Sequence, residues 1–200
     1  MIIENTITSL LNFTPEIILF IMSMVILLAG LFKFSSKYVF HLAVLSVIVA
    51  FIVSLQNQTI TSSLLFNNSI IKTNVTDFFK HICYFIFLVQ ILISRNYLKD
   101  KKIITGEFYS LLIFALLGCF IIISSNNLIV LFLGIELSSL SLYSLIALNR
   151  SSILSSEAAI KYFVLSTIAS GIILFGFSYL YGITGTLSIS DISKYLISSD

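Results

Sequence analysis

Glu136 is the residue whose type and position most directly suggest chemistry. It lies near the middle of LIVLFLGIELSSLSLYSLIALNR, residues 128–150, a run apolar enough to cross a lipid bilayer. An acid at the centre of a bilayer costs about 2.5 to 3.5 kcal/mol on insertion scales. Groups that bear this cost usually serve ion or proton pathways, so we interpret Glu136 as a candidate proton-binding residue.

The helical spacing around Glu136 predicts that this segment has two faces turned away from lipid. Ser139 and Tyr143 lie on the same face as Glu136 and add two hydroxyl groups to it. The opposite face has small residues at spacings that favour close helix packing, namely Gly134, Ser138 and Ser141. We therefore expect this helix inside a bundle, where a cation moving near Glu136 would change how firmly the carboxylate holds a proton.

Lys161 is the second candidate, within AAIKYFVL near the start of the last apolar segment. At a rise of about 1.5 Å per residue, Glu136 and Lys161 are offset by about 10 Å along the membrane normal. That offset is too large for a direct salt bridge, so water or another polypeptide would have to supply the partner of Glu136. Two structural alternatives stay open: Glu136 as a permanently protonated acid, and Lys161 as a lysine that only reaches toward the membrane surface.

The elements that position these residues are six apolar segments. Hydrophobic residues make up 58% of the 200 residues and charged residues only 10%, with a mean hydropathy of +1.09. Each segment is long enough for a membrane-spanning helix and lacks the alternation of barrel strands. The predicted fold is an all-α, polytopic transmembrane helix bundle, with spans at about 16–33, 38–56, 78–95, 108–125, 127–148 and 157–181.

We divide the chain into two parts. Residues 1–106 form a three-helix membrane segment with a polar loop at 56–77, and its apolar spans are expected to carry no charge. Residues 107–200 hold helices 4 to 6 and a short amphipathic tail at 188–197. Residues 124–127 leave almost no loop between helices 4 and 5, which predicts a tight antiparallel hairpin.

The distribution of basic residues predicts the orientation of the bundle. Loops on the cytoplasmic or matrix side are enriched in Lys and Arg. Basic residues follow the odd-numbered helices, at Lys33, Lys37, Arg95, Lys99, Lys101, Lys102 and Arg150. Lys72 and Lys80, which follow the second helix, are weaker evidence against this orientation. The sequence contains neither a metal-spaced Cys/His set nor a soluble catalytic motif, and Cys83 and Cys119 are interpreted as packing residues.

Two stretches carry a family resemblance: NNLIVLFLGIELSSLSLYSLIALNR, and SSEAAIKYFVLSTIASGIILFGFSYLYGITGTL after it. Over about residues 107–187 the chain closely resembles the antiporter-like membrane subunits of NADH dehydrogenase (complex I), and best the type called subunit 2 in mitochondria and subunit N in bacteria. In that family Glu136 matches the helix 5 glutamate of the proton channel, within GIEL. Lys161 matches the lysine of the KYF motif on helix 6.

The resemblance implies proton translocation coupled to NADH:ubiquinone electron transfer, with Glu136 and Lys161 as the translocating residues and no redox chemistry in this chain. It also implies no cofactor and no metal here, since NADH, flavin and iron–sulfur clusters belong to other subunits. The expected partners are other complex I membrane subunits, membrane lipids and no nucleic acid. The family's later helices are absent, which predicts a split protein completed by a second polypeptide.

The expected location is the mitochondrial inner membrane, with the odd-numbered loops facing the matrix. Abundant Ile, Asn, Ser, Lys and Tyr with a single Pro are typical of AT-rich genomes, which include many organelle genomes. Two alternative functions stay open. The chain could be a structural membrane scaffold of the complex that does not pump, or a subunit of a sodium/proton antiporter.

Overall fold

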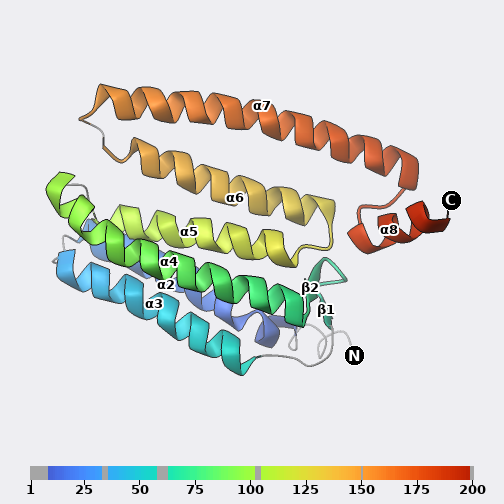
Figure 1. Cartoon of the computed structure of the whole chain (residues 1–200), viewed down its shortest axis with the longest axis horizontal. Coiled ribbons are helices and arrows are strands. Elements are labelled where there is room, and N and C mark those ends of the chain that lie inside the picture. The colour runs from blue at the N-terminus through green and yellow to red at the C-terminus, as the bar shows by residue number, and fades with distance from the viewer. Residues whose placement is uncertain (1–8, 33–35, 58–62, 102–104, 150, 199–200) are drawn as a thin grey trace.

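The protein is a bundle of long helices with a small β-hairpin at one end (Figure 1). This computed structural model describes residues 9–32, 36–57, 63–101, 105–149 and 151–198. Its helices are α2 (Thr14–Leu31), α3 (Ser36–Gln56), α4 (Asn74–Lys101), α5 (Thr105–Ser124), α6 (Leu128–Ala147), α7 (Ile153–Thr184) and α8 (Ile189–Ser198). Among the described residues, six helices, α2 to α7, are long and apolar enough to cross a membrane. The predicted fold class is confirmed.

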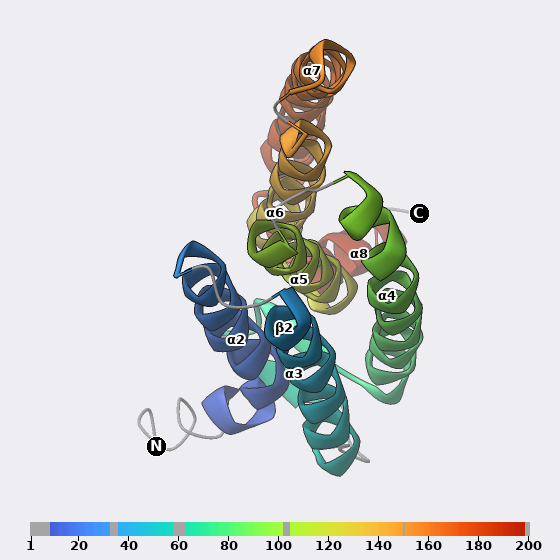
Figure 2. The same cartoon turned by 90° about the vertical axis from the view of Figure 1, so that its left-hand side faces the viewer.

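Helix α5 occupies the centre of the bundle. Helices α2, α3 and α4 pack on one side of it, and α6 lies on the other side between α5 and α7 (Figure 2). Large apolar side chains from four helices meet around α5 and are almost fully buried: Leu19, Val47, Tyr84, Leu116 and Phe120. Helix α6 thus has a neighbouring helix on two sides, and its buried residues are Leu128, Gly134 and Ser141. Helix α7 is the outermost, and its one residue described as buried is Ala159.

The tight hairpin of α5 and α6 was predicted correctly, and glycines explain how close its helices come. A Cβ atom built on Gly118 would lie 2.7 Å from the backbone nitrogen of Ser138 and 2.9 Å from the carbonyl oxygen of Gly134. Asn127 caps α6, since its Oδ1 accepts a hydrogen bond of 2.9 Å from the backbone N–H of Ile129. The small-residue face of α6 therefore packs against α5, as its spacing indicated.

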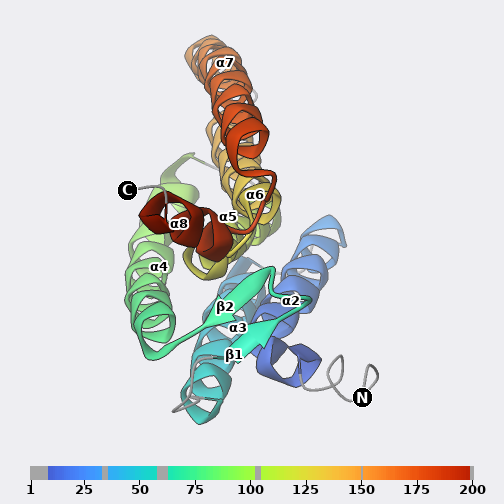
Figure 3. The same ribbon diagram turned by 90° about the vertical axis from the view of Figure 1, so that its right-hand side faces the viewer.

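Residues 63–77, within the segment expected to be a polar loop, contain regular secondary structure. They contain β1 (Ser63–Leu65) and β2 (Ile70–Lys72), which pair antiparallel with Ser63 opposite Lys72. Three consecutive residues turn the hairpin with positive φ angles, namely Phe66, Asn67 and Asn68. Helix α4 then begins at Asn74, inside the expected loop. Figure 3 shows this hairpin at the same end of the bundle as α8.

Asn126 ties that end of the bundle together. Its backbone N–H donates to the carbonyl of Ser69 at 2.8 Å, and its Nδ2 donates to the carbonyl of Asn68 at 2.8 Å. Its own carbonyl accepts from the N–H of Ile189 at 2.8 Å, and its Oδ1 accepts from the N–H of Ser190 at 3.1 Å. One buried asparagine thus connects the β-hairpin, the α5–α6 turn and the start of α8.

Candidate functional site

Glu136 lies at the interface between α6 and α7. Its side chain is partly buried, and its Oε1 accepts a hydrogen bond from the hydroxyl of Ser170 on α7. Sequence reasoning missed Ser170, which is one of many serines and sits in no recognisable motif. A carboxylate that accepts a hydrogen bond from a hydroxyl group can take up a proton at that position, because the hydroxyl can rotate between donating and accepting.

Lys161 is not close enough to bond Glu136. Its Nζ lies 2.6 Å from Oε1 of Glu157, one turn earlier on the same helix, and the two side chains are 71% and 54% exposed. The ion-pair partner of Lys161 is thus a residue of its own helix rather than Glu136. Exposed ion pairs at this spacing contribute only about 0.3 to 0.5 kcal/mol, so Lys161 can leave Glu157 at little cost.

Tyr143, which lies on the same face of α6 as Glu136, also contacts α7. The ring of Tyr143 lies 5.4 Å from the ring of Phe163 and 6.2 Å from that of Tyr162, in edge-to-face arrangements. Tyr143 had been grouped with Glu136 from helical spacing alone, and both contact the same neighbouring helix. The interface of α6 and α7 thus has Glu136 and Ser170 in its middle part and an aromatic cluster nearer the start of α7.

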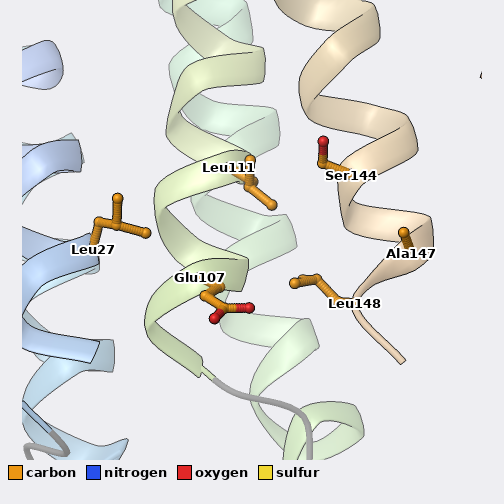
Figure 4. Close-up of a pocket in the computed structure, with 6 residues that line it drawn as sticks. All are labelled: Leu27, Glu107, Leu111, Ser144, Ala147 and Leu148. Carbon is orange, nitrogen blue, oxygen red and sulfur yellow. The ribbon is translucent and has the colours of Figure 1, made fainter. Parts of the chain in front are cut away.

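A second acid lies at the opposite end of the bundle from the β-hairpin. Glu107, in the first turn of α5, reaches into a cavity of about 320 Å³ between α2, α5 and α6 (Figure 4). The side chains lining this cavity are otherwise mainly apolar, with one hydroxyl group: Leu27, Leu111, Ser144, Ala147 and Leu148. Ser144 is two helical turns from Glu136 on α6, so the cavity and the candidate proton site share a helix.

The expectation that the first three helices carry no charge in their apolar spans was wrong. Lys80 in α4 is 7% exposed, and its Nζ lies 2.7 Å from Oε1 of Glu16 in α2, which is 5% exposed. The two residues are 64 positions apart, and no periodicity in either helix signals the pairing.

The comparison with known families covers the part of the chain that holds the candidate site. Residues 125–199 match the model of a family described as "NADH:quinone oxidoreductase/Mrp antiporter, TM". The matched range begins at the α5–α6 turn and includes α6, α7 and α8. Glu136, Ser170 and Lys161 all lie inside it.

Curated relatives extend the likeness over most of the chain. NADH-quinone oxidoreductase subunit N of Thioalkalivibrio sulfidiphilus is 43% identical over 187 residues, which are 92% of this chain and 39% of the relative. The same subunit of Nitrosomonas europaea is 39% identical over 184 residues, 91% of this chain and 38% of the relative. The chain therefore spans about two fifths of the length of these relatives.

Solved structures agree with the sequence comparisons. A chain of respiratory complex I from Thermus thermophilus with bound aureothin matches with a TM-score of 0.72 and 26% identity, over 87% of this chain and 38% of that chain. A chain of the membrane-bound sulfane sulfur reductase, an archaeal respiratory membrane complex, matches with a TM-score of 0.70 and 20% identity, over 94% of this chain and 39% of that one. The second likeness concerns the fold alone.

The fold and the site define the class of protein: this is an all-α, multi-pass membrane protein of the antiporter-like kind. Within that class, the chain is homologous to bacterial NADH-quinone oxidoreductase subunit N over about two fifths of that subunit's length.

Proposed function

We propose that this protein contributes to a membrane-arm subunit of NADH:quinone oxidoreductase and takes part in proton translocation coupled to electron transfer. The names of the relatives supply the complex and the reaction. The observation that carries the proposal for this chain is Glu136, a partly buried acid between two membrane-spanning helices that is hydrogen-bonded to Ser170. The redox chemistry is assigned to other subunits, and this chain handles the proton.

The proposed step at Glu136 is a simple proton exchange. The carboxylate accepts a proton and becomes neutral, and it returns to its charged form when the proton passes to the next carrier. Ser170 stabilises the charged form by donating to Oε1, and it can accept from the acid once the proton is bound. Lys161 is the movable cation of this scheme, because its exposed pair with Glu157 holds it only weakly.

The two alternative functions are less well supported. A scaffold without pumping has no need of an acid in the middle of a membrane helix, which costs folding free energy. A sodium/proton antiporter subunit would fit the family description, which covers both classes. The named relatives above are oxidoreductase subunits, and this favours the first reading.

We further propose that the basic residues mark the matrix or cytoplasmic side. Lys37 and Lys99 are exposed at the end of the bundle away from the β-hairpin, whereas Lys72 and Lys80 are buried and so do not count as loop charges. The predicted positions Lys33, Lys102 and Arg150 lie outside the described residues. The amino-acid usage of the chain supports a location in the mitochondrial inner membrane, and fractionation of cells that express the protein would test this location.

The outer face of α7 is the surface from which we propose partners for this protein. This helix exposes large apolar side chains along its length, including Leu165, Ile172 and Phe175. We propose that further membrane helices cover this face, alongside other membrane subunits of the complex. Purification through a tag on this chain, followed by mass spectrometry of the membrane complex, would identify the polypeptides that supply them. Recovery of this chain without any other membrane subunit would contradict the proposal.

The experiment that tests the function is Glu136→Gln, which keeps the shape of the side chain but cannot ionise. Proton translocation and NADH:quinone turnover are measured in membranes where assembly of the complex has been verified. We expect loss of pumping or of coupled turnover. Asp100→Asn, an equivalent change at an exposed acid near the end of α4, is the matched control. Normal pumping and turnover in Glu136→Gln would refute the proposal.

A further inference from the structure

Four charged side chains are buried together where α2, β2 and α4 meet. They are two acids and two lysines, each between 5% and 7% exposed: Glu16, Lys72, Asp77 and Lys80. We call these four residues the hairpin-end charge cluster. Its formal charge is zero, and its members come from the first turn of α2, the end of β2 and the first two turns of α4. Ionisable residues buried in a membrane protein are functional-site candidates by default.

The members of the cluster are held at fixed places and act on one another. Lys80 Nζ lies 2.7 Å from Glu16 Oε1, and Lys72 Nζ donates a hydrogen bond to the carbonyl of Asn57. Burial lowers the pKa of the Lys72 ammonium, although the carboxylates of Asp77 and Glu16 act in the opposite direction. A change of protonation at one member therefore changes the electrostatic energy of the others.

The cluster has more capacity for hydrogen bonds than the chain itself fills. Among the described residues, Glu16 Oε2, Asp77 Oδ2 and the hydroxyl of Tyr84 are buried and have no hydrogen-bond partner. Tyr84 is 1% exposed and packs against the rings of Phe51 and Phe120. Buried polar atoms in folded proteins are nearly always hydrogen-bonded, so the two acid oxygens have capacity for a further hydrogen bond, which a bound proton could make.

The cluster also borders a cavity. Asp77 lines a cavity of about 200 Å³ at the start of α4, together with Asn74, Phe78 and His81. The Nε2 atom of His81 lies 3.3 Å from the hydroxyl of Ser54 on α3. One acid of the cluster thus lines a cavity at the hairpin end of the bundle.

A purely structural role explains these observations less well. One ion pair would suffice to clamp α2 to α4, and an apolar pair of similar volume would serve as well or better. A clamp requires neither a second acid and a second lysine nor unpartnered oxygen atoms. The helices concerned are already joined by an apolar core that includes Leu19, Tyr84 and Ile91.

We propose that the hairpin-end charge cluster is a second proton-exchange site, separate from Glu136 and reached from the hairpin end of the bundle. A proton enters at Asp77 and passes to Glu16, where it neutralises the carboxylate and leaves the cluster with one net positive charge. Release of the same proton restores neutrality. This inference rests on the proposed function, since it assigns a further step to the same proton-translocating activity.

The test removes both charges of the pair at once, so that no unpaired charge stays buried. Glu16→Gln combined with Lys80→Met is introduced, and protons translocated per NADH oxidised are measured in the assembled complex. We expect a loss of protons per NADH while NADH oxidation continues. The control is Asp191→Asn combined with Lys194→Gln, which removes an exposed ion pair of 3.1 Å at the same end of the molecule.

Asp77→Asn keeps the inference testable if the double variant does not assemble. This substitution leaves the Glu16–Lys80 pair intact and removes only the acid that lines the cavity, and it should give the same loss of protons per NADH. A normal ratio in assembled complexes carrying Asp77→Asn would overturn the inference. If that ratio is normal while Glu136→Gln abolishes pumping, only the second site fails. If the complex carrying Glu136→Gln also pumps normally, both the second site and the proposed function are refuted.

Discussion

The hydroxyl of Ser170 on α7 donates a hydrogen bond to Oε1 of Glu136 on α6, across the interface of two membrane-spanning helices. This bond is the direct contact between the candidate proton site and the outermost helix of the bundle. Ser170 thereby joins α7 to the carboxylate of Glu136.

Ser170→Ala should lower the rate of proton pumping in the assembled complex. A hydrogen bond to a charged group contributes about 1.5 to 3 kcal/mol, and this substitution removes the one that Ser170 donates to Glu136. Ser170→Thr keeps a hydroxyl group and should restore pumping, whereas Ser178→Ala, at a serine two turns further along α7, should leave it unchanged. A wild-type pumping rate in Ser170→Ala would contradict a role for this bond.

Removing the charge of Lys161 should lower proton pumping, whereas removing the charge of Glu157 should not. Their exposed ion pair contributes little to stability, so neither Lys161→Met nor Glu157→Gln should lower the unfolding temperature of the purified protein by more than a few degrees. Pumping should fall in Lys161→Met, if this lysine is the movable cation for Glu136, and should persist in Glu157→Gln. Equal pumping in the two variants would leave Lys161 without a transport role.

Gly118→Ala should destabilise the protein through the contact of α5 with α6. The added methyl group would lie 2.7 Å from the backbone nitrogen of Ser138, and such overpacking costs about 1 to 3 kcal/mol. Gly171→Ala on α7 is the matched control, because no atom lies within 4 Å of the added Cβ. Thermal unfolding in detergent will separate the two variants, with a lower midpoint expected for Gly118→Ala only.

The features that the sequence predicted correctly are those that depend on local spacing. The α5–α6 hairpin follows from two apolar runs that nearly touch at residues 124–127. Gly134 and Ser138 face α5 because small residues at this spacing make one face of a helix. Each of these features involves a single helix or two helices in immediate succession.

The features that the sequence did not reveal depend on how distant helices are placed. Ser170 bonds Glu136 only because α7 has one particular rotation about its axis, and α7 contains several other serines and threonines that satisfy the same composition. Glu16 and Lys80 form an ion pair although they lie 64 positions apart, near a β-hairpin that was expected to be a loop. Pairings of this kind are set by tertiary packing and leave no periodic signal in either segment.

Lys80→Met should be more destabilising than the simultaneous replacement of Lys80 and Glu16. The single change leaves Glu16 buried at 5% exposure without its cation, and breaking a buried pair in this way costs about 3 to 5 kcal/mol. In Glu16→Gln with Lys80→Met no unpaired charge is left, so most of that loss should be recovered. Chemical denaturation of the purified protein measures the free energy of unfolding of the single and the double variant. A double variant as unstable as the single one would show that the pair's shape, rather than its charge, holds α2 to α4.

Acidification should loosen α8 before the rest of the bundle. A hydrogen bond from Lys194, at 3.1 Å, and a second from Ser188 lower the pKa of the Asp191 carboxyl below its ordinary value. A carboxyl whose pKa is lower in the folded state stabilises that state above its unfolded pKa, and this contribution is lost as the pH falls through the folded pKa. Hydrogen exchange of the α8 amides should therefore accelerate at a pH below about 3.9, the ordinary value for Asp. The side chain introduced by Asp191→Asn cannot ionise. In this variant the hydrogen exchange of the α8 amides should no longer accelerate as the pH falls below that value. An unchanged acceleration would show that another group causes it.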